Sequence, residues 1–103
     1  MAKPPFEFVD RFRSNLRRCR RLSGLSQEGL GFLASIHRTE VSLLERGERV
    51  PRIDTLVKLS APLEVTPNDL LDGIEWLPKR DRPKGTFWTR SRLEAPDRPP
   101  DRA

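Results

Sequence analysis

Residues 25–47 contain two short stretches in which apolar side chains recur at the spacing of an α-helix. Leu30 and Leu33 mark the apolar face of the first stretch, and Val41 and Leu44 mark that of the second. Each helix would have about eight residues, which is too short to be stable alone in water. We therefore predict that the two helices pack against each other and leave the outer face of the second one free.

The residues around these stretches favour helix ends at defined positions. Ser26 is a typical N-cap before a first helix over about residues 27–34, and Gly47 suits the end of the second helix. Ala34–His37 interrupts the apolar pattern and predicts a tight turn. His37, the last residue of that turn, is expected to cap the second helix.

Helical spacing continues on both sides of this segment. A first helix is predicted from Glu7 or Asp10 to Leu22, and its inward face is apolar: Phe8, Phe12, Leu16 and Cys19. A fourth helix is predicted over about residues 53–61, with four inward residues: Ile53, Leu56, Leu59 and Leu63. Pro62 is expected to end this helix early, because proline lacks the backbone donor and disfavours helical geometry in the residue before it.

A last short helix is predicted after Thr66. Thr66 is a suitable cap, Pro67 suits the first helical position, and Asp69 completes a capping pattern three residues after the cap. From Leu77 onward the composition shifts to prolines and charged residues, and the tail from about Ser91 is expected to be disordered.

Two short aromatic stretches interrupt this polar extension. The first, over residues 73–77, contains Trp76, and the second, over residues 85–90, contains Phe87 and Trp88. They can pair as a hairpin, cover an open face of the domain, or bind a partner. We favour packing or pairing, because a soluble monomer rarely exposes large aromatic side chains.

The length and composition indicate one small domain with tails. The chain has 103 residues, of which 35% are hydrophobic, enough for one small core. We divide it into an N-terminal lead-in over residues 1–9, a helical domain over 10–75 and a Pro/Arg-rich extension over 76–103. The single Cys and the lack of a long apolar run argue against a disulfide framework, a membrane span or a signal peptide, so we expect a cytoplasmic protein.

The positive charge lies at the two ends of the chain. Residues 1–21 carry seven basic and two acidic side chains, residues 22–75 carry five and nine, and residues 76–103 carry eight and four. An electrostatic field that attracts phosphate must therefore come largely from the first helix and the extension.

The segment 25–47, LSQEGLGFLASIHRTEVSLLERG, resembles the lambda repressor/Cro-like (XRE-type) helix-turn-helix family almost position by position, and the resemblance covers about residues 12–72. It implies an all-α fold, a compact five-helix domain, followed here by a short basic tail that forms a β-hairpin or is disordered. It also implies a bacterial transcription regulator that binds double-stranded DNA sequence-specifically as a homodimer and needs no cofactor.

The resemblance also assigns roles to individual residues. The helix over about His37–Arg46 is the recognition helix that enters the major groove. Its expected DNA contacts are His37, Arg38, Thr39, Ser42, Leu43 and Arg46. Arg38 can offer two donors to guanine, with a phosphate contact as the alternative. Gln27 is expected to bind a phosphate and brace the recognition helix, and Arg17 to contact DNA from the first helix.

One further pair and two departures follow from the same resemblance. Arg20 and Glu45 match a structural ion pair that ties the first helix to the end of the third. Glu40 stands where a carboxylate would repel the DNA backbone, and Leu43 offers only apolar contact in the second turn. Arg46 and Arg49, in the turn that follows, are expected to compensate by binding phosphate.

The residues give no pattern for catalysis or for a metal site. There is no glycine-rich phosphate loop and no Cys–His or Ser–His arrangement, so we expect no enzyme. Our first hypothesis is the DNA-binding regulator, with a dimer face that could involve Trp76, Phe87 and Trp88. The second is an antitoxin-like autorepressor whose C-terminal tail binds a partner protein. The third is a domain that contacts protein and no DNA.

Overall fold

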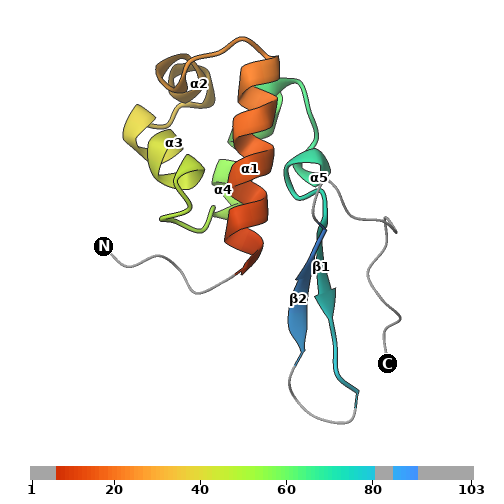
Figure 1. Cartoon of the computed structure of the whole chain (residues 1–103). Helices are drawn as coiled ribbons and strands as arrows, with labels where there is room; N and C mark the ends of the chain where they lie inside the picture. Colours follow the sequence, from red (N-terminus) through yellow and green to blue (C-terminus); the bar gives the residue numbers. More distant parts are fainter. Residues whose placement is uncertain (1–6, 81–84, 91–103) are drawn as a thin grey trace.

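The computed structural model describes residues 7–80 and 85–90, so the prediction of a disordered tail from Ser91 lies outside the described residues. The described residues form five helices and one antiparallel hairpin: α1 Glu7–Leu22, α2 Gln27–Ala34, α3 Arg38–Glu45, α4 Ile53–Leu63, α5 Pro67–Leu70, β1 Ile74–Leu77 and β2 Thr86–Thr89 (Figure 1). The predicted five-helix class and the hairpin are confirmed. Helix α1 begins at Glu7, inside the predicted lead-in. Within the described ranges, no helix is long and apolar enough to cross a membrane.

One hydrophobic core holds the five helices together. Each helix contributes a leucine with 0% exposed surface, namely Leu16, Leu30, Leu44, Leu59 and Leu70. Burial of a side chain of this size contributes roughly 1.5–3 kcal/mol. The core therefore stabilises α2 and α3, which are too short to persist alone.

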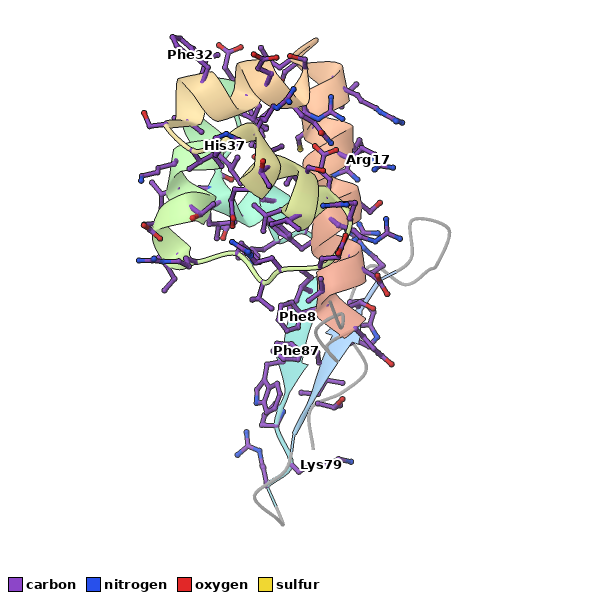
Figure 2. The ribbon with its side chains drawn as sticks, turned by 90° about the vertical axis from the view of Figure 1, so that its left-hand side faces the viewer. Phe8, Arg17, Phe32, His37, Lys79 and Phe87 are labelled. Atoms are coloured by element: carbon purple, nitrogen blue, oxygen red, sulfur yellow. The ribbon has the colours of Figure 1, made fainter. Side chains whose placement is uncertain are left out.

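Helices α2 and α3 approach closely at Gly31. A Cβ atom at Gly31 would lie 2.8 Å from the carbonyl oxygen of Ile36, so only glycine fits without a backbone shift. This approach turns Gly31, Leu30 and Ala34 inward. The prediction that Leu33 faces the core is wrong, because Leu33 is 55% exposed. Phe32 is 82% exposed and lies on the outer side of α2 (Figure 2).

The predicted inward face of α4 is wrong at its first residue. Ile53 is 83% exposed, and the inward position is taken by Thr55, which is 7% exposed. Thr55, Leu59 and Leu63 are four residues apart and share one face. Ile53 precedes Thr55 by two residues and therefore points about 200° away from that face.

Helix α4 also runs through Pro62, contrary to our prediction. The helix ends one residue later, where Glu64 adopts a left-handed conformation with φ 57°. The backbone N–H of Glu64 donates to the carbonyl of Ala61, and that of Val65 donates to the carbonyl of Ser60, both at 3.1 Å. Because Pro62 lies in the last turn, it removes a single helical hydrogen bond, and the terminal turn satisfies the nearby carbonyls.

Helix α5 is short and is fixed at both ends. Thr66 and Asp69 form the predicted capping box, in which each side chain accepts from the other residue's backbone N–H. At the other end, the buried amide of Asn15 donates to the carbonyls of Leu70 and Asp72, both at 2.9 Å. These bonds join α5 to α1.

The hairpin extends the fold beyond the N-terminal end of α1. Trp76 of β1 lies opposite Phe87 of β2, and their ring centroids are 5.1 Å apart. Phe8 of α1 also packs against Phe87, with ring centroids 4.5 Å apart (Figure 2). Trp76 remains 47% exposed, and Figure 2 shows Lys79 near the far end of the hairpin.

Charged groups fasten the base of the hairpin to α1. Arg11 donates from Nε to the carbonyl of Asp72 at 3.0 Å, and its Nη2 lies 3.3 Å from the Asp72 carboxylate. Arg90, just after β2, donates to the same carboxylate at 2.8 Å. The hairpin is therefore attached by aromatic packing and by ion pairs.

Candidate nucleic-acid interface

Helix α3 is held by one face and exposes the other. Val41, Leu44 and Glu45 are each buried to 0% exposure and face the core. At the N-terminal end, His37 acts as the cap: its Nδ1 accepts from the backbone N–H of Thr39 at 3.0 Å. This cap satisfies one of the otherwise unpaired N–H groups of the first turn and fixes the direction of the helix.

The outer face of α3 brings most of the expected contact residues together. Arg38, Thr39 and Arg46 are exposed, and Ser42 and Leu43 are half-buried between them. The Arg38 side chain is weakly held, since its Nη1 lies 4.0 Å from the exposed carboxylate of Glu28.

Arg46 lies at the C-terminal end of this outer face. Its guanidinium lies 3.0 Å from the Glu48 carboxylate and donates to the carbonyl of Ser42 at 3.4 Å. Both partners leave N–H groups of Arg46 free, because a guanidinium carries five donors.

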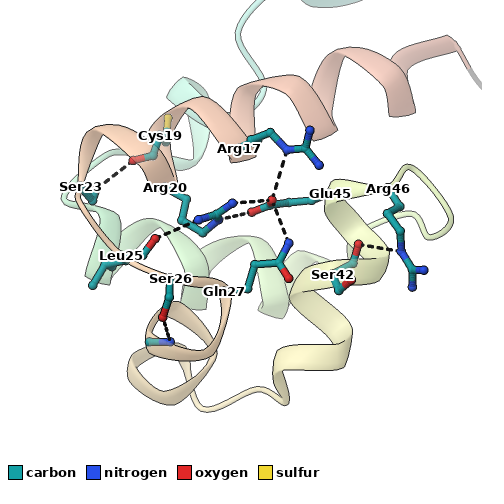
Figure 3. Close-up of polar contacts among 11 residues, drawn as sticks. Arg17, Cys19, Arg20, Ser23, Leu25, Ser26, Gln27, Ser42, Glu45 and Arg46 are labelled. Carbon is teal, nitrogen blue, oxygen red and sulfur yellow. Dashed lines mark hydrogen bonds and ion pairs between the residues drawn. The ribbon is translucent and has the colours of Figure 1, made fainter.

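A buried carboxylate fixes α3 to α1. Arg20 donates from Nε to Oε2 of Glu45 and from Nη2 to Oε1 at 2.9 Å, and its Nη1 donates to the carbonyl of Leu25 at 2.9 Å (Figure 3). Arg20 and Glu45 thus form the ion pair that the resemblance implies. The two-pronged geometry gives both strength and a defined orientation.

Two further donors reach the same carboxylate: Gln27, which was expected to brace the recognition helix, and Arg17, whose contact with Glu45 was not foreseen. Gln27 donates from Nε2 to Oε1 of Glu45 at 3.1 Å, and Arg17 donates from Nε to Oε1 at 3.4 Å (Figure 3). The available signal was the position of Arg17, one helical turn before Arg20 on α1. Glu45 therefore joins α1, α2 and α3 at one point.

The surroundings of Glu45 shift its protonation. Burial raises the pKa of the Glu45 carboxyl, but the hydrogen bonds from Arg20, Gln27 and Arg17 outweigh this effect, so the pKa lies below its ordinary value. The hydrogen bond to Glu45 in turn raises the pKa of Arg20. The carboxylate is therefore charged at neutral pH and holds its three donors.

The two residues that depart from the family pattern lie on one flank of the outer face. Glu40 does not present a free carboxylate, because Arg49 donates from Nη1 to its Oε1. The sequence did not indicate this pair: the turn after α3 brings Glu40 and Arg49 together, and the phosphate contact expected of Arg49 stays a prediction. Leu43 is half-buried next to them.

Further positive charge lies on the solvent face of α1. Four arginines line a surface hollow there together with Ser14 and Leu22: Arg13, Arg17, Arg18 and Arg21. Arg13 also pairs with Asp10 at 3.2 Å. The solvent face of α1 therefore carries more cationic side chains than the outer face of α3.

Comparison with known proteins places the chain among DNA-binding-type domains. The model of the helix-turn-helix family HTH_3 matches residues 16–70. The control protein C.BamHI of Bacillus amyloliquefaciens is 48% identical over 50 residues, which cover 48% of this chain and 62% of that relative, less than two thirds of its length.

Two solved structures share the architecture. The crystal structure of the restriction-modification controller protein C.AhdI from Aeromonas hydrophila has a TM-score of 0.59 and 37% identity, covering 60% of this chain and 94% of that one. The master regulator for biofilm formation SinR, solved in complex with DNA, has a TM-score of 0.57 and 31% identity, covering 59% and 98%. With more than half of its length matched, this chain belongs to the helix-turn-helix family HTH_3, of the lambda repressor/Cro (XRE) type.

Proposed function

We propose that this chain is a sequence-specific DNA-binding transcription regulator that inserts its recognition helix, about His37–Arg46, into the major groove. The observation that carries the proposal is the division of α3 into a buried face and an outer face with Arg38, Thr39 and Ser42. In helix-turn-helix proteins, the first turns of this helix meet the base edges. Arg38 then reads guanine through two donors, and Thr39 meets a base or a thymine methyl group.

Phosphate contacts position the helix in this proposal. Gln27 uses one N–H of its amide for Glu45, which leaves the second N–H for a phosphate oxygen. Arg17 uses Nε for the same carboxylate and keeps both terminal nitrogens free for phosphate. Arg46 is exposed at the other end of the outer face. The Glu45 carboxylate thus orients two phosphate-binding side chains before DNA arrives.

The relatives suggest the regulatory setting. C.BamHI is named a control protein, and C.AhdI a controller protein of a restriction-modification system. We propose that this chain controls transcription as a homodimer on two symmetric half-sites. Genes for a restriction-modification system are the first candidates for its regulation.

Selection of bound duplexes from a random pool by the full chain tests this function. We expect enrichment of an inverted repeat whose half-sites are about one helical turn or a multiple of it apart. Sedimentation on the selected duplex should give two chains per site. Failure to enrich any sequence at low salt would overturn the proposal.

A second candidate function is the antitoxin-like autorepressor whose C-terminal extension binds a partner protein. It is favoured by Trp76, which remains 47% exposed on the hairpin. Co-expression with the product of the adjacent gene tests this function. A stable complex that is lost in Trp76→Ala, while DNA binding persists, would support it; a homodimer that forms without residues 76–103 and takes up no partner would favour the plain regulator.

A further inference from the structure

Glu40 and Arg49 form an ion pair along the flank of the recognition helix. Nη1 of Arg49 lies 2.5 Å from Oε1 of Glu40, and the two side chains are 46% and 23% exposed, respectively. Nine residues separate them in sequence. Glu40 lies on the third position of α3, and Arg49 lies in the turn between α3 and α4.

The backbone of the turn brings Arg49 to this place. The N–H of Glu48 donates to the carbonyl of Leu43 at 3.0 Å, and that of Gly47 donates to the carbonyl of Leu44 at 3.2 Å. Gly47 has φ 72°, a conformation that favours glycine. The turn therefore folds back over the end of α3, and Arg49 is held near Glu40 by the chain itself as well as by charge.

The arginines beside the outer face differ in how firmly they are held. Arg38 is 68% exposed and lies 4.0 Å from Glu28, whose carboxylate is itself 79% exposed. Arg49 is closer to its carboxylate and less exposed. An exposed pair at 4.0 Å is easily opened, whereas a phosphate must compete with a carboxylate already in place to bind Arg49.

This competition has different consequences on different DNA. An arginine that binds phosphate strengthens binding to every sequence, because phosphates carry no base information. On a preferred site, the base contacts of Arg38 fix the position of the helix, whereas on random DNA the protein can shift until a free guanidinium reaches a phosphate. An ion pair that competes with phosphate for one arginine therefore weakens the affinity for random DNA more than the affinity for the preferred site.

On the basis of the proposed function, we propose that Glu40 is a specificity-determining residue, which holds Arg49 in an intramolecular ion pair, offsets its positive charge and so weakens its attraction to phosphate on DNA of any sequence. Glu40 acts through Arg49 and does not itself read a base. The departure from the family pattern at Glu40 is thereby explained as a restraint on nonspecific binding.

The test measures binding of wild type, Glu40→Gln, Arg49→Ala and the double variant to the selected duplex and to a random-sequence duplex of the same length, at several salt concentrations. We expect Glu40→Gln to tighten random binding on the order of five-fold, as for release of one exposed ion pair. Binding to the selected duplex should tighten less, so the ratio of the two affinities falls. The salt slope on random DNA should steepen by about 0.9, the value for one added phosphate contact.

The decisive comparison is the same substitution without Arg49. In the Arg49→Ala background, Glu40→Gln should leave the affinity ratio unchanged. Asp54→Asn is the matched control: it removes one negative charge from the Arg52–Asp54 pair at the start of α4 and should not lower the ratio. Thermal unfolding of each variant verifies that it is folded.

Three results would overturn the inference: an equal gain on both duplexes, the same gain with and without Arg49, or weaker binding by Glu40→Gln. Equal gains independent of Arg49 would mean that Glu40 only repels phosphate. If wild type itself showed no preference for the selected duplex, the proposed function would fail, which is a separate outcome from the failure of this inference.

Discussion

Arg20 and Glu45 meet through two parallel hydrogen bonds at a carboxylate that is completely buried, while the Arg20 side chain is 13% exposed. Without Arg20, the buried carboxylate of Glu45 keeps only the hydrogen bonds from Gln27 at 3.1 Å and Arg17 at 3.4 Å, both to Oε1. We expect Arg20→Ala to lower the free energy of unfolding by about 3–5 kcal/mol. Urea unfolding at pH 7 measures this change. The control is Arg52→Ala, which breaks an exposed pair and should cost about 1 kcal/mol or less.

The stability of the domain should depend on pH through Glu45. Because its pKa is lower in the folded than in the unfolded chain, the stabilisation is present above the ordinary pKa of 4.5 and is lost as the pH falls through the lower, folded value. The NMR shift of the Glu45 carboxyl carbon, followed in acid, reports this titration directly. A midpoint at or above 4.5 would contradict the prediction.

Arg38 and Gln27 should affect binding in different ways. Arg38→Ala is expected to lose ~1–3 kcal/mol on the selected duplex and to relax the preference at one base position. Gln27→Ala should weaken binding to all duplexes more evenly, because a phosphate contact carries no base information. Binding isotherms on selected, single-mismatch and random duplexes separate the two. An equal loss on selected and random DNA in Arg38→Ala would identify Arg38 as a phosphate contact.

Two glycines of α2 offer a matched comparison of packing. An alanine at Gly31 would place Cβ 2.8 Å from the Ile36 carbonyl oxygen and 3.2 Å from the Arg38 nitrogen, both backbone atoms. We expect Gly31→Ala to destabilise the domain by ~1–3 kcal/mol. At Gly29 the nearest atom is the Ser26 hydroxyl at 3.2 Å, a side chain that can shift, so Gly29→Ala should change stability by about 1 kcal/mol or less. Thermal unfolding of both variants tests the difference, and a tolerated Gly31→Ala would refute it.

The end of the extension should contribute little to the salt dependence of DNA binding. Residues 91–103 carry three basic and three acidic side chains, so the basic excess of the extension lies in residues 76–90. Removing residues 91–103 should therefore leave the slope of log affinity against log salt unchanged. A slope that flattens by about 0.9 or more would indicate that this segment binds phosphate directly.

The sequence predicted best what depends on local rules. The bounds of α2, the caps at Ser26 and His37 and the capping box at Thr66 follow from nearest neighbours in the chain. Leu33 and Ile53 were wrongly predicted to face the core. An apolar side chain can be buried, but the way in which neighbouring helices pack decides whether it is.

Contacts between distant residues needed the path of the chain. The Glu40–Arg49 pair depends on a turn that folds back over α3, which no spacing in the sequence indicates. Gln27 was expected to contact phosphate and to brace the recognition helix, and Arg17 to contact DNA. Both side chains also meet the Glu45 carboxylate, because three helices converge there. The aromatic stretches allowed a hairpin, but the packing of Phe87 against Phe8 required both partners in space.

Helix α1 connects two regions of different character. Near its start, Phe8 packs against Phe87 of the hairpin. Twelve residues later, Arg20 binds the Glu45 carboxylate of the recognition helix. Twelve helical residues span about 18 Å. The hairpin and the recognition helix are thus attached to the same helix, about 18 Å apart, so any force on the hairpin acts on the helix that also positions α3.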